Sequence, residues 1–184
     1  MPGLRITGGT LRGQRVSIPP QDVRPTSERA RQAYFNIVQD RVADAHFLDL
    51  FAGSGIFSME ALSRGAKISV AVDNTPAAVR ALSVTAKNCP GSLRVVHADV
   101  FAALKQLAGE RFQLVYADPP YDFSRYPQLV ESIERSAVLA ANSVLAIEHR
   151  TGRESVFGIP PGSLTHWKTV HYGEVSISLF QTQE

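Results

Sequence analysis

The chain has 184 residues, of which 44% are hydrophobic and 20% are charged, and its formal net charge at pH 7 is +2. This length and composition predict one globular domain, and a pI of about 8.9 permits a nucleic-acid partner without requiring one. Cys89 is the only cysteine, which excludes an intrachain disulfide and a zinc site built from cysteines. No apolar stretch approaches the roughly 20 residues of a membrane span, and no signal-peptide pattern is present. We therefore expect a cytoplasmic protein.

The amino end of the chain is basic. Residues 1–32 contain only two acids, against six arginines: Arg5, Arg12, Arg15, Arg24, Arg29 and Arg31. Two short runs around Gly8 and Gly9 predict an arginine-bearing β-hairpin over residues 4–18. Prolines keep the following segment extended, and a helix is expected to open at residues 26–28. We interpret residues 1–45 as a basic N-terminal extension, with the predicted hairpin and helix, and residues 46–184 as an α/β domain.

From residue 46 onward, strand-like and helix-like segments alternate. Apolar runs predict five strands at 46–51, 68–73, 93–99, 112–121 and 143–149. Helical patterns lie between them at 57–64, 75–89, 100–108 and 126–140. The tail, residues 164–181, alternates on both sides of Gly173 and predicts an antiparallel hairpin. Repeated β-α units imply a mostly parallel sheet with helices on both faces, closed here by that hairpin.

A glycine-rich turn follows the first of these strands. It contains Asp49, Phe51, Gly53 and Gly55, at the point where open α/β sheets bind ligands. The glycines allow a sharp turn and a close approach of the backbone to a ligand, although any strand-to-helix turn favours glycine. The spacing matches neither the dinucleotide fingerprint, because its third glycine position is Ser58, nor a Walker A loop. NAD and ATP are therefore poorly supported.

The next two strands also end in acids. Asp73 can accept hydrogen bonds from both hydroxyls of a ribose, or it can cap the helix that begins near Thr75 and Pro76. Asp99 can face an adenine amino group or cap the helix that begins near Val100. With Asp49, these acids would line one edge of the sheet, and three acids at successive strand ends favour a ligand site there.

The motif Asp118-Pro119-Pro120-Tyr121 closes the fourth predicted strand and lies on the same edge. The exocyclic amine of a base is a poor nucleophile, because its lone pair is delocalised into the ring. The Asp118 carboxylate and the Pro119 carbonyl can accept its two N–H bonds, while the prolines fix the backbone. Tyr121 offers an aromatic face on which the base can stack. A proline-rich turn is the alternative interpretation, but its position after this series of strands favours chemistry.

The assembled pattern resembles the amino-group methyltransferases of nucleic acids, and most closely the RsmD-type methyltransferases. The resemblance is carried by LRITGGTLRGQRV, RPTSERARQAYFNIV, FLDLFAGSGIFSMEALSRGA and ADPPY, and it runs from about residue 4 to residue 122. It implies a Rossmann-like class I S-adenosylmethionine methyltransferase with a seven-stranded sheet. It also implies methylation of a guanine N2 in the small-subunit ribosomal RNA of bacteria, within an assembled or assembling subunit.

The resemblance also implies roles for individual residues. Asp49, Gly53 and Gly55, with Phe51, would cradle the methionine end of the cofactor. Asp73 with Asn74 would hold the ribose, and Asp99 with Val100 would meet the adenine. Asp118 to Tyr121 would grip the guanine beside the cofactor. The RNA-facing arginines would be Arg5, Arg12, Arg15 and Arg24. Two departures stand out, since Ser58 replaces a usual glycine and Asp73 replaces a frequent glutamate.

The implied mechanism is a direct in-line transfer that needs no metal. The guanine amine attacks the sulfonium methyl group, S-adenosylhomocysteine leaves, and the proton follows. An unperturbed aspartate has a pKa of about 3.9, so we expect Asp118 to position the amine rather than act as a strong base. An amino methyltransferase for adenine or cytosine in DNA or RNA stays open, because pocket shape sets the target base. A non-catalytic RNA-binding domain is the more distant alternative, and we expect a monomer.

Overall fold

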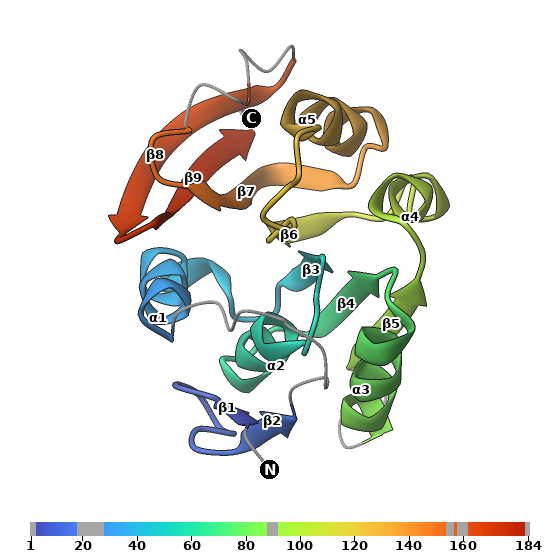
Figure 1. Ribbon diagram of the computed structural model, residues 1–184, viewed down its shortest axis with the longest axis vertical. Helices are drawn as coiled ribbons and strands as arrows, with labels where there is room; N and C mark the ends of the chain where they lie inside the picture. The colour runs from blue at the N-terminus through green and yellow to red at the C-terminus, as the bar shows by residue number, and fades with distance from the viewer. Residues whose placement is uncertain (1–2, 18–27, 88–91, 154–156, 158–161, 183–184) are drawn as a thin grey trace.

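The computed structural model describes residues 3–17, 28–87, 92–153, 157 and 162–182. Its centre is a seven-stranded sheet in the order β5-β4-β3-β6-β7-β9-β8 (Figure 1). The strands are β3 (His46–Leu50), β4 (Ile68–Asp73), β5 (Leu93–His97), β6 (Phe112–Ala117), β7 (Leu139–Arg150), β8 (Leu164–Tyr172) and β9 (Val175–Thr182). Strands β3 to β7 pair in parallel, whereas β9 is antiparallel to both β7 and β8. The predicted parallel sheet with an antiparallel closing hairpin is confirmed.

Helices cover both faces of this sheet (Figure 1). One face carries α1 (Glu28–Ile37), α2 (Ile56–Ser63) and α3 (Pro76–Lys87), and the other carries α4 (Val100–Gln106) and α5 (Tyr126–Arg135). Buried side chains form one apolar cluster on each face, with Phe35 and Phe57 in the first and Leu104 and Leu129 in the second. Strands covered on both faces need apolar side chains on both sides, which explains the buried run from Leu114 to Ala117 in β6. No helix in the described part of the chain is long and apolar enough to cross a membrane.

The order of the sheet reverses at β3. Strand β4 lies on one side of β3 and β6 on the other, so the connections leaving β3 and β6 run in opposite directions. Such a reversal opens a crevice at the carboxyl ends of the strands, because the two crossover helices lie on opposite faces. The β3–α2 loop and the segment after β6 therefore meet at the point where α/β sheets bind ligands.

The N-terminal hairpin packs on the end of α2. Its strands, β1 (Gly3–Arg5) and β2 (Arg15–Ser17), pair antiparallel as the sequence predicted. Between them, Gly9 adopts a φ of 76°, and a Cβ there would overlap the Ser63 carbonyl. The Thr10 amide donates to that carbonyl at 2.8 Å, and the Leu11 amide donates to Ser63 Oγ at 2.8 Å. Glycine at position 9 thus permits direct contact between the hairpin and α2.

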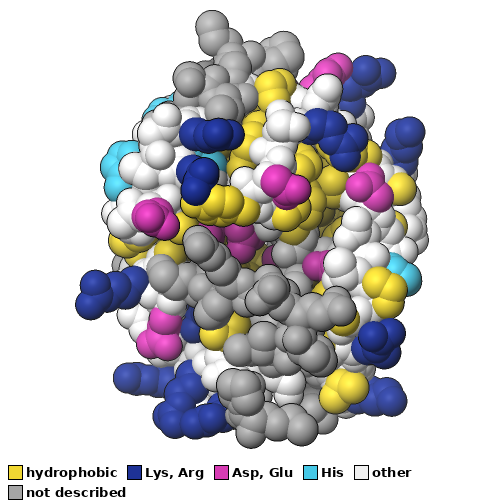
Figure 2. Space-filling model, in the orientation of Figure 1, with side chains coloured by type: hydrophobic (Ala, Val, Ile, Leu, Met, Phe, Trp, Pro, Cys, Tyr) yellow, Lys and Arg dark blue, Asp and Glu magenta, His cyan; other side chains and the backbone are white. Residues whose placement is uncertain are grey.

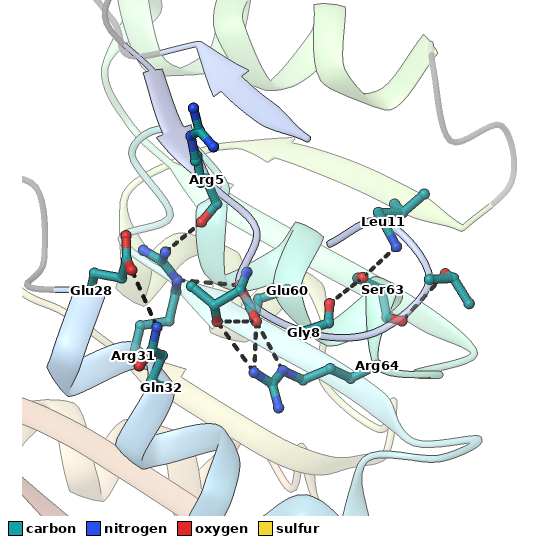
Figure 3. A network of polar contacts seen from close by, with 11 residues as sticks. Arg5, Gly8, Leu11, Glu28, Arg31, Gln32, Glu60, Ser63 and Arg64 are labelled. Atoms are coloured by element: carbon teal, nitrogen blue, oxygen red, sulfur yellow. Dashed lines mark hydrogen bonds and ion pairs between the residues drawn. The ribbon is translucent and has the colours of Figure 1, made fainter. Parts of the chain in front are cut away.

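A buried polar network fixes the hairpin, α1 and α2 together (Figure 3). Glu60 lies at its centre, with Arg31 Nε at 3.4 Å and Arg64 Nη2 at 2.9 Å from its two carboxylate oxygens. The Thr7 amide and hydroxyl donate to the same carboxylate at 2.9 and 2.6 Å. Arg31 also donates to the Arg5 carbonyl at 2.7 Å. The side chains of Arg31 and Glu60 are fully buried, so the hairpin is anchored through charges removed from water.

The predicted helix at 126–140 was wrong at its carboxyl end. Helix α5 stops at Arg135, Ala137 has a φ of 52°, and β7 already begins at Leu139. A left-handed residue breaks the helical hydrogen-bond pattern, and the Ser136 hydroxyl donates back to the Ile133 carbonyl at 2.8 Å. A short 3-10 helix, η1 (Gln39–Arg41), was not predicted.

Candidate active site

The β3–α2 loop turns through left-handed backbone conformations. Phe51, Gly53 and Gly55 have φ values of 65°, 53° and 76°. This region is costly for a phenylalanine, so the surrounding contacts must hold Phe51 there. The loop is tied to β4 by the Ala52 amide, which donates to the Val72 carbonyl at 2.9 Å. The result is a narrow backbone turn directly above the carboxyl end of β3.

Gly55 is set by packing as well as by its backbone angle. A Cβ at this position would overlap a terminal methyl group of Leu82 on α3. Gly55 also stands immediately before the first residue of α2. Any side chain at position 55 would therefore have to displace the buried Leu82 side chain where α3 packs against the start of α2.

Asp49 lies below this loop and is 2% exposed. Its Oδ2 accepts hydrogen bonds from the Ser58 amide at 3.0 Å and from the Ser58 hydroxyl at 2.7 Å. Burial raises the pKa of Asp49 to about 7, with a further rise from the charges of Asp118 and Asp73, while the bonds from Ser58 oppose the shift. Ser58, which departs from the pattern of the family it resembles, thus supplies a hydroxyl that tightens the start of α2.

Asp73 uses both carboxylate oxygens at the end of β4. Oδ2 accepts from the Gly53 amide at 2.8 Å, and Oδ1 accepts from the Thr75 amide and hydroxyl at 2.8 and 2.7 Å. It therefore fixes the glycine-rich loop and the turn that leads into α3. An ionised carboxylate has about four acceptor positions, so these three bonds leave capacity for a ribose hydroxyl. The neighbouring Asn74 is exposed, and its carbonyl lies 3.3 Å from His97 Nε2.

Asp99 caps α4, as one of the two interpretations expected. Its Oδ1 accepts from the Phe101 amide at 3.0 Å, and the residue is exposed. Val100 is 4% exposed and its side chain packs in the apolar cluster beneath α4. A contact between Val100 and an adenine would therefore have to come from its backbone.

The segment Asp118 to Tyr121 begins where β6 ends. The Asp118 amide donates to the Leu50 carbonyl at 3.2 Å, which links it to β3. A tight turn follows, closed by the Phe123 amide on the Pro120 carbonyl at 2.8 Å. The Phe123 ring then packs edge-on against Phe51 at 5.5 Å between ring centroids. The structure thus brings the predicted target-binding segment and the predicted cofactor loop into contact.

Two residues at the end of β7 join the site, although the sequence reasoning missed them. Glu148 is 7% exposed and accepts a hydrogen bond from the Tyr116 hydroxyl at 2.7 Å. Burial raises the pKa of Glu148 to about 8, and the nearby charge of Asp118 adds to the rise. The Arg150 guanidinium lies 3.7 Å from the centre of the Tyr121 ring, and so covers part of it. An acid at the end of an apolar strand was the available signal for Glu148.

A comparison with known protein families shows to which family this chain belongs. The family model described as conserved hypothetical protein 95 matches residues 4–181. The chain belongs to this family. Ribosomal RNA small subunit methyltransferase D of Escherichia coli (strain K12) is 29% identical over 182 residues, which cover 98% of this chain and 90% of that protein. The Haemophilus influenzae protein of the same name is 28% identical over 183 residues, covering 97% and 93%.

A solved structure shows the same fold for this family member. The Escherichia coli protein yhhF superposes with a TM-score of 0.87 at 28% identity, covering 99% of both chains. The coverage of both chains places the N-terminal hairpin, the sheet and the closing hairpin within the shared architecture. The resemblance to RsmD-type methyltransferases inferred from the sequence is confirmed.

The arginines expected to face RNA lie mostly on the N-terminal hairpin, β1 and β2. Arg5, Arg12 and Arg15 are exposed, whereas Arg24 lies outside the described residues. Figure 2 shows lysine and arginine side chains at the lower end of this face, where Figure 1 places β1 and β2. Acidic side chains lie nearer the middle of the face. The hairpin thus presents positive charge apart from the acids of the site.

Two further features bear on the choice of site. Among the described residues, no three histidines, cysteines or acids lie together as a metal site. A hollow of about 250 Å³ lies at the outer edge of the sheet, between β5 and α4, where Arg94, His97 and Leu107 line it. None of the predicted site residues lines that hollow. We therefore place the candidate active site at the carboxyl ends of β3 and β6, where the order of the sheet reverses.

Proposed function

We propose that this family member transfers a methyl group from S-adenosylmethionine to the exocyclic N2 amine of a guanine in bacterial small-subunit ribosomal RNA. One observation carries the proposal. The segment Asp118 to Tyr121 lies beside the glycine-rich loop, at the point where the strand order of the sheet reverses. This arrangement supports bringing a base amine next to a cofactor. The names of the Escherichia coli and Haemophilus influenzae relatives support ribosomal RNA as the substrate.

The residues present fit the proposed cofactor. The backbone turn at Phe51, Gly53 and Gly55 has no bulky side chain at its two glycines, so a ligand can approach the main chain closely. Asp73 retains capacity to accept from a ribose hydroxyl beside that turn. Asp49, Asn74, Asp99 and Val100 complete the proposed binding set. When bound, S-adenosylmethionine supplies a methyl group that its sulfonium already activates.

The protein's contribution is to orient the amine. The Asp118 carboxylate and the Pro119 carbonyl each accept one N–H of the guanine amine, which localises the nitrogen lone pair and aims it. Pro119 and Pro120 fix the backbone of this segment, and Tyr121 provides a surface on which the base stacks. Arg150 covers part of that ring, so the base uses the remaining surface. Positioning of this kind supplies most of the rate, since neither partner needs further activation.

The hairpin completes the proposal. Residues 1–45 act as the RNA-facing extension and residues 46–184 as the transferase domain, with Arg5, Arg12, Arg15 and Arg24 on RNA phosphates. The substrate is RNA within an assembled or assembling small ribosomal subunit, which would place the protein in the bacterial cytoplasm. We expect a monomer to be sufficient for the reaction, since the carboxylates and the loop of the proposed site all come from one chain.

The test is transfer of labelled methyl groups from S-adenosylmethionine to small-subunit ribosomal RNA, as naked RNA and as particles. Wild type is expected to label the RNA, and Asp118→Ala is expected to lose at least about 100-fold in rate while still binding S-adenosylhomocysteine. Glu131→Gln, an exposed change on α5, serves as the control. Wild type that binds the cofactor but labels no RNA would leave only an RNA-binding domain.

A further inference from the structure

Glu148 and Asp118 stand side by side at the ends of adjacent strands. Ala117 of β6 pairs with Ile147 of β7, so the next residues on the two strands are Asp118 and Glu148. Paired strands lie about 4.8 Å apart, and residues in register point to the same face of the sheet. Both carboxylates therefore lie on one face, over the crevice where the proposed function places the target base.

The position of the Glu148 carboxylate is tightly fixed. The Tyr116 hydroxyl donates to its Oε2 at 2.7 Å. The Tyr116 ring in turn stacks on Phe57 at 3.9 Å between centroids and packs against Tyr34 at 4.9 Å. Tyr116 is fully buried and lies two residues before Asp118 on the same strand face. Glu148 is thus held through a rigid aromatic cluster, with its second oxygen left for another donor.

Guanine differs from adenine and cytosine in the hydrogen-bond donors that lie beside its amino group. Guanine carries two donors side by side, the ring N1–H and the exocyclic N2–H. Adenine and cytosine instead carry an amino group beside a ring nitrogen that is an acceptor. A carboxylate facing a ring acceptor gains no hydrogen bond and leaves a buried polar atom unpaired, which costs binding free energy. Adjacent carboxylates at the strand ends therefore match guanine and disfavour the other two amino-bearing bases.

We propose that Glu148 is a specificity-determining residue that accepts the N1–H of the target guanine while Asp118 accepts an N2–H. The inference rests on the proposed function, and it deepens that function by naming how guanine is selected. Burial raises the pKa of Glu148 to about 8 in the free protein, so its carboxyl group must ionise to accept from guanine. The guanine donors favour this ionised form, because hydrogen bonds to a charged acceptor stabilise its charge. A site built to bond a substrate group rejects an analogue that lacks the group, which is the discrimination expected here.

The experiment uses RNA that carries 2-aminopurine at the methylated position. This base keeps the 2-amino group, but its N1 is an acceptor without a hydrogen. We expect wild type to favour guanine over 2-aminopurine by at least about 100-fold in kcat/KM. In Glu148→Gln the side-chain amide can donate to N1, so this preference is expected to fall at least about tenfold. The missing O6 of 2-aminopurine affects both enzymes, so it cancels when the two preferences are compared.

Glu131→Gln makes the same chemical change on the exposed surface of α5 and is expected to keep the wild-type preference. Glu148→Asp is a second variant, which keeps the charge on a shorter side chain and is expected to retain more of the preference than Glu148→Gln. Binding of S-adenosylhomocysteine by each variant shows that the fold is intact.

Three results would overturn the inference. Equal reductions in kcat/KM on both RNAs in Glu148→Gln would assign Glu148 a purely structural role. Label in methyladenine or methylcytosine from the wild type would remove the guanine edge on which the inference depends, while methyl transfer itself would stand. No transfer by the wild type to any RNA would overturn the proposed function and this inference with it.

Discussion

Two buried residues next to the β3–α2 loop hold the start of α2 in place. Asp49 and Ser58 lock the start of α2 through two hydrogen bonds, and both residues are almost completely buried. A glycine at position 58 would keep the amide bond but lose the hydroxyl. The serine therefore strengthens the anchoring of α2, whereas the sequence alone showed it only as a departure from the usual glycine.

Gly55→Ala tests the close approach of α2 and α3. The new methyl group would overlap Leu82 and force alanine into a φ of 76°. We expect a loss of about 2–4 kcal/mol in the free energy of unfolding, and weaker binding of S-adenosylhomocysteine. Urea unfolding and calorimetric titration measure the two effects.

Gly109→Ala is the matched control for that change. Gly109 has a φ of 89°, but nothing lies within 4 Å of its added Cβ. This variant carries only the backbone penalty of about 1–2 kcal/mol, and it should bind the cofactor product as wild type does. Equal behaviour of the two alanine variants would show that contact with Leu82 does not shape the loop.

At the scale of elements, the N-terminal hairpin is a fixed part of the fold. Glu60→Gln removes the charge that compensates the fully buried Arg31, and breaking such a pair costs about 3–5 kcal/mol. Glu131→Gln breaks an exposed ion pair with Arg135 and should cost no more than about 1 kcal/mol. Urea unfolding of both variants is the measurement. A Glu60→Gln protein as stable as the Glu131→Gln protein would mean that the network does not anchor the hairpin.

The hairpin arginines should act on RNA affinity alone. Replacing exposed Arg12 and Arg15 with alanine is expected to weaken RNA binding. The negative slope of log K against log salt should become shallower by about 0.7–0.9 for each phosphate that the variant no longer neutralises. Binding of S-adenosylhomocysteine should stay unchanged, because the hairpin lies away from the glycine-rich loop (Figure 1). Filter binding over a salt series measures the slope. An unchanged slope would show that these two arginines do not bind RNA phosphates.

The sequence predicted the elements that repeat a simple pattern. Alternating apolar segments specify the parallel strands and the closing hairpin, and acids at the ends of β3, β4 and β6 indicated the functional edge. Contacts between segments far apart in the sequence could not be predicted, even where a residue such as Glu148 carried a local signal. Glu148 joins the site only through the register between β6 and β7, and Gly9 meets Ser63 across more than fifty residues. The end of α5 depends on the left-handed Ala137, which carries no local signal.

At the scale of the whole molecule, buried carboxyl groups make stability depend on pH. Burial raises the pKa of Asp49 to about 7 and that of Glu148 to about 8, from ordinary values of 3.8 and 4.5. The folded protein therefore retains protons that the unfolded chain releases, so this contribution to stability is full below about pH 4 and is lost as the pH rises to about 8. We expect the free energy of unfolding to fall between pH 5 and pH 8.

Comparison with Glu148→Gln isolates the part that belongs to Glu148. The variant lacks this titrating group, so its stability should decline less than that of wild type, by on the order of 1 kcal/mol for each pH unit. Urea unfolding at pH 5, 6, 7 and 8 gives the two curves. A difference between wild type and variant that stays constant over this range would show that the folded-state pKa of Glu148 is not raised.

The nucleoside that receives the methyl group shows whether the target base is guanine. Small-subunit ribosomal RNA labelled by the wild-type protein would be digested to nucleosides and separated by chromatography with mass detection. We expect the label in N2-methylguanosine, at one position. Label in N6-methyladenosine or N4-methylcytidine would contradict this expectation, because Asp118 and Glu148 would then face a base whose ring nitrogen cannot donate to Glu148.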